Sequence, residues 1–463
     1  SEPAALTLFS PTDAHAAGLS VPAQFRSLDD ILALPLSTVT VGVGDPRVPQ
    51  AGGGLVRRWD TVHLFIQDVW RFRPRLSVSY GLGWSIDRNL NYDLSRPRLL
   101  EPILGEDGLG PTRKEWKNFS PALGFVWTPS ANAETVVHAG AGLFYDFLFN
   151  PNLDAERAAL GPPGLGRRTT DGNSIYNPLP GFPDVAVGAQ LNFRSKPTSF
   201  TGANLMEILP AVRDGLLQRL DNTLEFNKTQ TDALNGRDVP SASALHVNAG
   251  LQRRVAKDLV VSADLVYRHF NHLGIGSVDM NHYDSLQGPV IPKCVGDDKD
   301  NPQVMCSNGQ IRFFAPVGRA TYKGLLVRAD KRFSHRLQFL GSWAYSRNTG
   351  TSAGNGFNLN NWLENRGPLG TDFTHILNLA GVARLRWQLG LGLNFSYSSA
   401  PPFSAFLGRA DLNGDGTQND LLPGSTFNVF NRGMGPQDLE QLVGEFNQAV
   451  STGTITLPSR YAL

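Results

Sequence analysis

The sequence predicts an all-β fold, a transmembrane antiparallel β-barrel with long extracellular loops. Three observations predict it: apolar residues alternate with small polar ones, the alternating stretches are long, and the connections between them are alternately short and long. Together these features are typical of a barrel in an outer membrane, with an apolar outer face, a polar lumen, short turns at one rim and long loops at the other.

The alternation is clearest in RLSVSYGLGWSID, which begins at Arg75. Every second residue from Leu76 to Ile86 is apolar or aromatic, and the residues between them are Ser or Gly. Only a β-strand separates two such sets onto opposite faces. The same pattern returns in 259–269, 337–347 and 388–398. The second face is small and polar, which suits a water-filled lumen.

Strand length favours this fold over its alternative, a soluble sandwich with one face in water. Strands of ordinary sheets run about 5–6 residues. The alternating stretches here run about ten to thirteen residues, which matches the tilted span of a bilayer. The sequence predicts about ten strands, at residues 61–70, 75–87, 119–128, 135–146, 245–254, 259–269, 321–333, 337–347, 374–386 and 388–398.

The connections predict five hairpins and divide the chain into regions. The short turns are Arg71–Pro74, Pro129–Glu134, Val255–Asp258, Ser334–Arg336 and one near Arg386–Gln388. We expect an extracellular loop region at 1–58, barrel strands at 59–146, a long extracellular insertion at 147–244, barrel strands and loops at 245–398, and an extracellular loop region at 399–463. In the insertion, GANLMEILPAVRDGLLQRLDN predicts one helix that Pro210 kinks or divides. This helix packs the loop onto itself or, alternatively, acts as a gate or lid.

Composition excludes several classes of protein. The net charge of +1 gives no electrostatic argument for binding nucleic acid. No run of eighteen apolar residues exists, which excludes a transmembrane helix. The first residues, Ser1-Glu2-Pro3, do not resemble a signal peptide, so we expect a mature, processed or partial chain.

The two cysteines, Cys294 and Cys306, enclose a loop rich in Asp, Pro and Gly. The sequence predicts a disulfide that closes this loop in an oxidising compartment. The alternative is a pair of free thiols in a reducing compartment.

The stretch DLNGDGTQND, residues 411–420, resembles part of a calcium loop. Oxygen-bearing side chains alternate along it and Gly416 stands at the turn, whereas Leu422 occupies the position of the bidentate Glu of an EF-hand. The sequence therefore predicts a short structural calcium site of weak, extracellular-type affinity, or an Asx-rich turn without metal. The candidate ligands are Asp411, Asn413, Asp415, Thr417, Asn419 and Asp420.

Two other motifs give little support to catalysis or to a second metal site. The run from Gly350 to Gly354 matches the G-x-S-x-G nucleophile elbow, but a loop sequence follows it where a helix is required. His269 and His272 lie at a strand end, where they would face opposite sides. We therefore expect no enzymatic activity.

Several stretches, taken in order, resemble one family. LFIQDVWRFRPRLSVSYGLGW (64–84), NFSPALGFVWTP (118–129), VHAGAGLFYD (137–146), YKGLLVRADKRFSHRLQFLGSWAYS (322–346) and DFTHILNLAGVARL (372–385) look like the barrel of TonB-dependent outer-membrane receptors. PPFSAFLGRADLNGDGTQND is similar to a loop of the Oar-like subgroup, which carries a carboxypeptidase-regulatory-like domain. The resemblance implies a barrel of twenty-two strands, of which this chain holds the middle-to-late part. It also implies a plug, not seen in this chain, on which a TonB-type energising protein acts.

These observations lead to two functional hypotheses for a protein of the Gram-negative outer membrane. The first is a transporter or receptor that binds a polar small molecule, peptide or glycan for energised uptake. The candidate lumen residues for that ligand are His246, Asn248, Gln252 and Asn394. The alternative is a structural or adhesive scaffold whose loops bind other outer-membrane or surface proteins.

Overall fold

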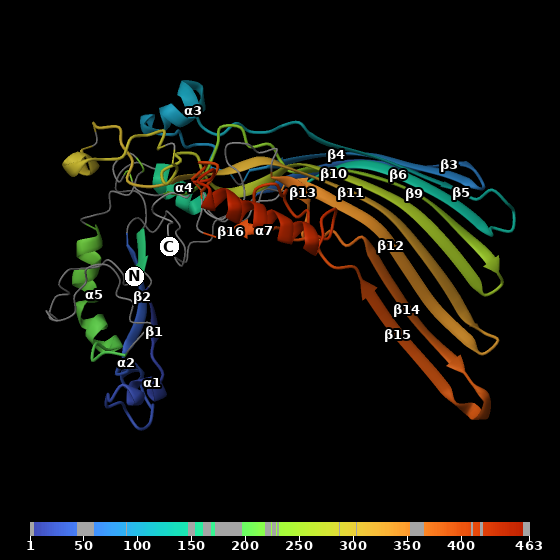
Figure 1. Ribbon diagram of the computed structural model, residues 1–463, viewed down its shortest axis with the longest axis horizontal. Helices are drawn as coiled ribbons and strands as arrows, with labels where there is room; N and C mark the ends of the chain where they lie inside the picture. Colours follow the sequence, from blue (N-terminus) through green and yellow to red (C-terminus); the bar gives the residue numbers. More distant parts are fainter. Residues whose placement is uncertain are drawn as a thin grey trace.

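One large antiparallel sheet dominates the computed structural model (Figure 1). The structure describes residues 4–43, 60–88, 90–146, 153–160, 168–171, 197–217, 224, 228, 231–286, 288–301, 303–351, 365–408, 411–416 and 420–456. The main path of the sheet runs in the order β15-β14-β12-β11-β10-β9-β6-β5-β4-β3. In addition, β13 pairs with β12, and β8 pairs with β11 in parallel.

The ten strands on this path confirm the ten predicted from the sequence. They are β3 (Thr61–Arg73), β4 (Leu76–Asp87), β5 (Asn118–Trp127), β6 (Thr135–Tyr145), β9 (Ser243–Ala256), β10 (Leu259–Asp279), β11 (Ile311–Ser334), β12 (Leu337–Thr351), β14 (His375–Arg384) and β15 (Gly390–Ser398). The largest difference is at β10 and β11, which continue beyond the predicted ends into the long loop between them. Bulges interrupt their pairing after Phe270, where the regular alternation also ends.

The alternation of short and long connections gives the sheet two distinct ends. Five hairpins close at what we name the short-turn end, and the long segments leave from the opposite, long-loop end. The predicted antiparallel sheet is confirmed, whereas the described strands form an open, curved sheet: within them, the outer edges of β3 and β15 pair with nothing.

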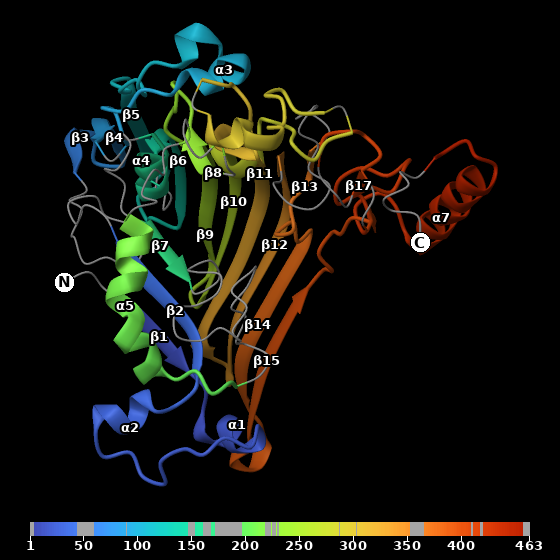
Figure 2. The ribbon, with the colours of Figure 1, turned by 90° about the vertical axis from the view of Figure 1, so that its left-hand side faces the viewer.

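A small sheet lies at the long-loop end, on the concave side of the large sheet (Figures 1 and 2). It is built from β1 (Ala4–Leu8), β2 (Leu36–Val43) and β7 (Arg168–Asp171), and α1 (Pro11–Ala16), α2 (Leu28–Leu32) and α5 (Gly202–Leu217) accompany it. The regions 1–58 and 147–244, expected as separate loops, thus contribute to one folded unit. Pairing between segments far apart in sequence leaves no local signal, which explains why the sequence did not indicate it.

The helix predicted in the insertion is present as α5, with Pro210 inside it. Thr201 and Asn204 cap its start reciprocally, since each backbone N–H donates to the side-chain oxygen of the other residue at 3.0 and 3.3 Å. Leu205 and Leu209 are buried together with Phe200, which precedes the helix. The helix therefore packs against β2 and α2 of the N-terminal region, contacts that neither interpretation of the insertion included.

The remaining elements belong to the long connections. They are η1 (Arg98–Leu100), α3 (Glu101–Gly108), α4 (Leu153–Leu160), β8 (Thr231–Asn235), η4 (Gly296–Asp300), β13 (Arg366–Pro368), η5 (Arg386–Gln388), β16 (Phe406–Leu407), β17 (Asp420–Leu421) and α7 (Pro436–Ser451). The helix α7 was not expected in the 399–463 loop region, although Pro436 and the capping Asp438, which accepts from the Gly435 N–H at 2.7 Å, are ordinary helix-start signals. No helix in the described ranges is long and apolar enough to cross a membrane.

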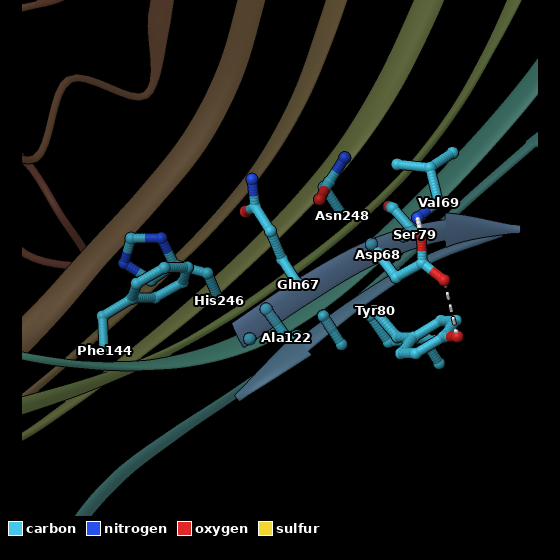
Figure 3. Close-up of a pocket in the computed structure, with 15 residues that line it drawn as sticks. Gln67, Asp68, Val69, Ser79, Tyr80, Ala122, Phe144, His246 and Asn248 are labelled. Carbon is cyan, nitrogen blue, oxygen red and sulfur yellow. Dashed lines mark hydrogen bonds between the residues drawn. The ribbon is translucent and has the colours of Figure 1, made fainter. Parts of the chain in front are cut away.

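The strand register assigns every side chain of the large sheet to one of two faces. Tyr80 lies opposite Leu123 across β4 and β5, on the face that carries the apolar and aromatic residues. His246 lies opposite Gly142, and Asn248 opposite Gly140, on the other face. Figure 3 shows His246 and Asn248 on the concave side and Tyr80 on the convex side. The convex face therefore carries mainly apolar and aromatic residues and the concave face mainly small and polar ones, as the alternation predicts.

Packing on the concave face depends on glycine at one position. His138 on β6 and Asp264 on β10 make a 2.7 Å contact across the intervening strand β9. They meet directly over Gly250, where a Cβ would lie 2.1 Å from the Asp264 carboxylate and 2.4 Å from the His138 ring. Any side chain at position 250 must therefore separate the pair.

The long loops are held partly by a disulfide and partly by a buried lysine. Cys294 and Cys306 form the predicted disulfide. The ammonium of Lys228, whose side chain is 1% exposed, donates to the backbone carbonyl of Asp298 at 3.0 Å and also to the carbonyls of Asn301 and Val304 inside that loop. Burial lowers the pKa of Lys228, and the nearby Asp298 carboxylate opposes this. The cation thus satisfies three carbonyls that the loop alone leaves turned inward.

Gly250→Ala is expected to lower the free energy of unfolding by about 1–3 kcal/mol, because the methyl group overpacks the His138–Asp264 contact. Urea unfolding of the protein folded into lipid vesicles measures this. Gly392→Ala on β15 is the matched control, since a Cβ there meets nothing within 4 Å. Equal stability of the two variants would contradict the packing argument.

Lys228→Met is expected to cost about 1–3 kcal/mol, because three inward-facing carbonyls lose their donor. The loss should show as faster proteolysis within the 294–306 loop while the disulfide stays intact. Lys293→Met is the control, because the Lys293 ammonium lies over the ring of Tyr283, 4.4 Å from its centroid. If both variants resist proteolysis like the parent, the ammonium does not hold the loop.

Candidate functional site

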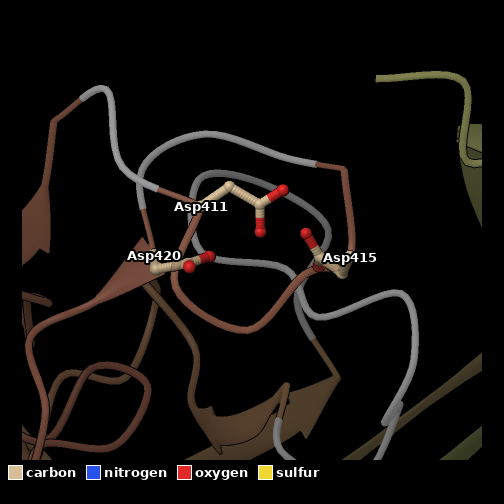
Figure 4. Close-up of side chains that lie close together, drawn as sticks. All are labelled: Asp411, Asp415 and Asp420. Atoms are coloured by element: carbon tan, nitrogen blue, oxygen red, sulfur yellow. The ribbon is translucent and has the colours of Figure 1, made fainter. Parts of the chain in front are cut away.

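The stretch singled out as a calcium loop brings three carboxylates together at the long-loop end (Figure 4). One oxygen from each of Asp411, Asp415 and Asp420 lies within 4.8 Å of the others. The three side chains are 1%, 0% and 4% exposed. Three carboxylates this close and this buried repel one another strongly unless a proton or a cation lies between them.

Backbone N–H groups shape the loop around these carboxylates. Asp411 accepts from Gly414 at 2.8 Å and from Gly416 at 3.2 Å. Asp420, on β17, accepts from the N–H groups of Leu412 and Asn413, so one side chain holds both ends of the loop. Such local Asx interactions close a tight loop without a hydrophobic core.

Two glycines allow the chain to turn at this place. Gly414 and Gly416 have φ values of +74° and +85°, in the region that other residues rarely adopt. A Cβ on Gly416 would also lie 3.3 Å from Ser285 of the neighbouring loop. The Ser285 hydroxyl donates to the Gly414 carbonyl at 2.6 Å, which fixes the acidic loop, described at residues 411–416 and 420, against the segment around Ser285.

Burial raises the pKa of Asp411 and of Asp420, and the Asp415 carboxylate adds to both increases, whereas the backbone donors oppose them. A hard cation with oxygen ligands fits this donor set, because it compensates three carboxylates at once. Asn413 uses its Oδ1 to accept from the Asp415 N–H at 2.9 Å, so it shapes the loop. Thr417 and Asn419 lie outside the described residues. The buried Asp triad can therefore bind a metal ion, and the other three ligands stay predictions.

A second candidate site lies on the concave face of the large sheet (Figure 3). A pocket of about 400 Å³ has a floor of small residues from β4, β5 and β6. Its walls include two of the four predicted lumen residues, His246 and Asn248 on β9. The Phe144 and His246 rings lie 5.0 Å apart, centroid to centroid. On the concave side the pocket combines an aromatic wall with neutral polar groups, a combination suited to an uncharged polar ligand.

The other two predicted lumen residues share this face but lie elsewhere on it. Gln252 is opposite Ser262 on β10, and Asn394 is opposite Ala380 on β14, far along the sheet. Neither lines the pocket. Conversely, Gln67 on β3 does line it and was missed, because β4, β5 and β6 separate β3 from β9 in an order that a sequence does not reveal.

Asp415→Asn tests the proposed metal site in two conditions, with calcium and with a chelator. In calcium, we expect the variant to lose most of the protection from proteolysis around residues 411–420, and titration calorimetry should give a parent dissociation constant of about 10⁻⁴–10⁻³ M. In a chelator, the variant should be at least as resistant as the parent, because one repelling charge is gone. Asp297→Asn, in an exposed turn, is the charge-matched control. Calcium protection that survives Asp415→Asn would exclude this cluster as the site.

Calcium affinity should rise with pH. A raised pKa means that the folded protein holds a proton at Asp411 and Asp420 more tightly than the unfolded chain, so this stabilisation exists at low pH and is lost as the pH rises through the raised pKa values. A cation takes over the compensation at higher pH and displaces the protons. Calorimetry in two buffers of different ionisation enthalpy measures the protons released. Binding without proton release would show that the carboxylates are already ionised in the free loop.

Comparison with known proteins adds a family. No curated protein matches the chain. Among solved structures, it is similar to the outer membrane transporter YddB from Escherichia coli, with 13% identity and a TM-score of 0.42 over 85% of this chain and 40% of YddB. It is also similar to the siderophore receptor PiuA from Acinetobacter baumannii, with 8% identity and a TM-score of 0.37 over 80% of this chain and 35% of PiuA. The siderophore receptor PirA from Pseudomonas aeruginosa is similar with 11% identity and a TM-score of 0.36 over 79% of this chain and 46% of PirA.

The chain spans less than half the length of each of these solved structures. Residues 44–405 match a family described as Outer membrane beta barrel domain. That match contains the whole large sheet and ends just before the acidic loop. It confirms the predicted location in the outer membrane and agrees with the expectation of a non-enzymatic barrel. The chain therefore belongs to the outer membrane beta-barrel domain family.

Proposed function

We propose that the protein is the barrel part of a TonB-dependent outer-membrane transporter or receptor, which binds a polar ligand for energised uptake. The observation that carries the proposal is the division of one membrane-length sheet into an apolar convex face and a small, polar concave face. A lumen of this kind transports or binds polar molecules, because lipid contacts only the other face. The strand sequences that resemble TonB-dependent barrels support the same reading.

The pocket beside His246 and Asn248 is the proposed place of ligand contact. On the concave side its polar groups are neutral amides, a hydroxyl and an imidazole, and Phe144 offers an aromatic surface, whereas Asp68 lies opposite Tyr80 on the convex side. Hydrogen-bonding groups beside an aromatic wall suit a small polar molecule, a peptide or a glycan. Gln252 and Asn394 would contact the ligand at other points of the same face.

Further strands complete the barrel in this proposal. The outer edges of β3 and β15 have no partner among the described strands, and unpaired edges in lipid cost several kcal/mol for each polar group. A twenty-two-stranded barrel that encloses a plug satisfies both edges, and the plug would transmit the action of a TonB-type protein.

The long-loop end would then face the outside of the cell. The small sheet with α5, the disulfide loop and the acidic loop all gather there. We assign the acidic loop a structural calcium ion, and PPFSAFLGRADLNGDGTQND supports placing the protein in the Oar-like subgroup.

Isolation of the protein from outer membranes tests the function. Intact mass and N-terminal sequencing should give a polypeptide near twice the mass of this chain, or a tightly bound second chain that carries a plug. Cross-linking in energised cells should then capture a TonB-type protein, and a protonophore should abolish that capture. A closed barrel without any plug would contradict the transport proposal.

A second candidate function is an adhesive or structural scaffold. The helix α7 favours it, because none of its residues is buried although one side of it carries Leu439, Leu442, Val443 and Phe446. Surface proteins recovered on the long loops, together with an absent plug, would favour the scaffold over the transporter.

A further inference from the structure

A groove on the convex face has a chemistry that ordinary lipid contact does not explain. It has a volume of about 600 Å³ and crosses β9, β10, β11 and β12. Val247, Ala249, Leu265 and Leu325 line its apolar part. Ala249 lies opposite Leu265 on β10, and its small side chain leaves room in the groove. A volume of this size lies within the range of small-molecule sites, about 300–1,000 Å³.

Two cations stand at one end of this groove. Lys323 on β11 and Arg347 on β12 both line it and are directly opposite each other in the strand register. Like charges in directly opposed positions destabilise a strand pair. Lys323 makes no hydrogen bond or ion pair with any residue that the structure describes. The arrangement is therefore unfavourable unless an anion lies between the two side chains.

The carboxylate that contacts Arg347 does not supply that anion. Arg347 lies 3.7 Å from Asp372, which is fully buried. Asp372 is already engaged by Arg432, whose Nε donates to it at 2.8 Å. Because Arg432 already neutralises Asp372, the charges of Lys323 and Arg347 stay in excess among the residues that the structure describes.

The position of these cations matches the depth of lipid headgroups. Arg347 follows the start of β12 at Leu337 by about ten residues, which is the length of a strand that crosses a bilayer. The rings of Trp343 and Tyr345 stack at 6.3 Å beside Arg347, and Trp343 donates to His375 at 3.3 Å. Aromatic residues of this kind gather at the membrane interface. The cations thus lie at the interface of the long-loop end, and the groove extends from them toward the membrane core.

We propose that this groove is a specific site for an anionic phospholipid-type molecule, whose phosphate lies between Lys323 and Arg347 and whose acyl chain occupies the apolar groove. The site is distinct from the concave face and independent of any transported ligand. It takes its occupant from the membrane leaflet at the long-loop end.

Native mass spectrometry of the full protein, offered dioleoyl phosphatidylglycerol or dioleoyl phosphatidylcholine at equal concentration, tests the site. The parent should retain the anionic lipid in preference, by roughly fivefold for each cation that contacts the phosphate. Lys323→Gln/Arg347→Gln should remove that preference, and Lys323→Gln alone should reduce it. Ala249→Leu, which fills the groove, should lower retention of both lipids. Millimolar inorganic phosphate should not compete, because it has no acyl chain.

Arg268→Gln/Arg328→Gln is the control with the same change of charge on adjacent strands. Both arginines lie on the concave face, opposite His246 and Ser342 respectively, so the lipid preference should persist. Heat-modified migration on a gel confirms that each variant is folded. Equal retention of the two lipids by the parent, a preference that survives the double Gln change, or competition by free phosphate would each overturn the proposal.

Discussion

The hydrogen-bonding demand of the backbone governs this structure. In a hydrocarbon environment every N–H and C=O must find a partner within the protein, because no water is present to replace it. The ten long strands meet the demand by pairing with each neighbour in a continuous ladder from β3 to β15. The strand lengths, the hairpin turns and the two faces all follow from that ladder, since its register fixes which side chains face lipid and which face the concave side.

The side chains of the two faces pack in different surroundings. On the convex side, large apolar and aromatic residues meet lipid, and the register even brings Lys323 and Arg347 opposite each other there. On the concave side, curvature crowds the side chains of neighbouring strands, and small residues relieve the crowding. Gly250 shows the effect most directly, because two side chains from the flanking strands meet above it. The same small residues leave the space that forms the pocket beside His246.

The long loops must fold outside the membrane, where they have little apolar surface to bury. One cluster, around Leu100, Leu234 and Ile311, joins three connections. Much of the remaining interior is polar: Arg96 and Glu156 are both 1% exposed by side chain, and Glu156 accepts from the Asn235 N–H at 2.7 Å. Buried polar groups are tolerable only where each finds partners, so these loops are specified by their hydrogen bonds. The Lys228 ammonium and the carboxylates of the acidic loop are likewise buried polar groups that make hydrogen bonds.

The sequence by itself determined the strands, the turns and the face of each strand residue, because a period of two residues is a local property of one strand. It also determined the disulfide and the acidic loop, since each lies within a short segment. Only the tertiary structure decided the order of the strands and the meeting of distant segments. It united 4–43 with 168–171 and 197–217, placed His138 against Asp264, and separated Asn394 from His246. These contacts depend on which strands become neighbours, which is a property of the whole ladder and of no single stretch of the chain.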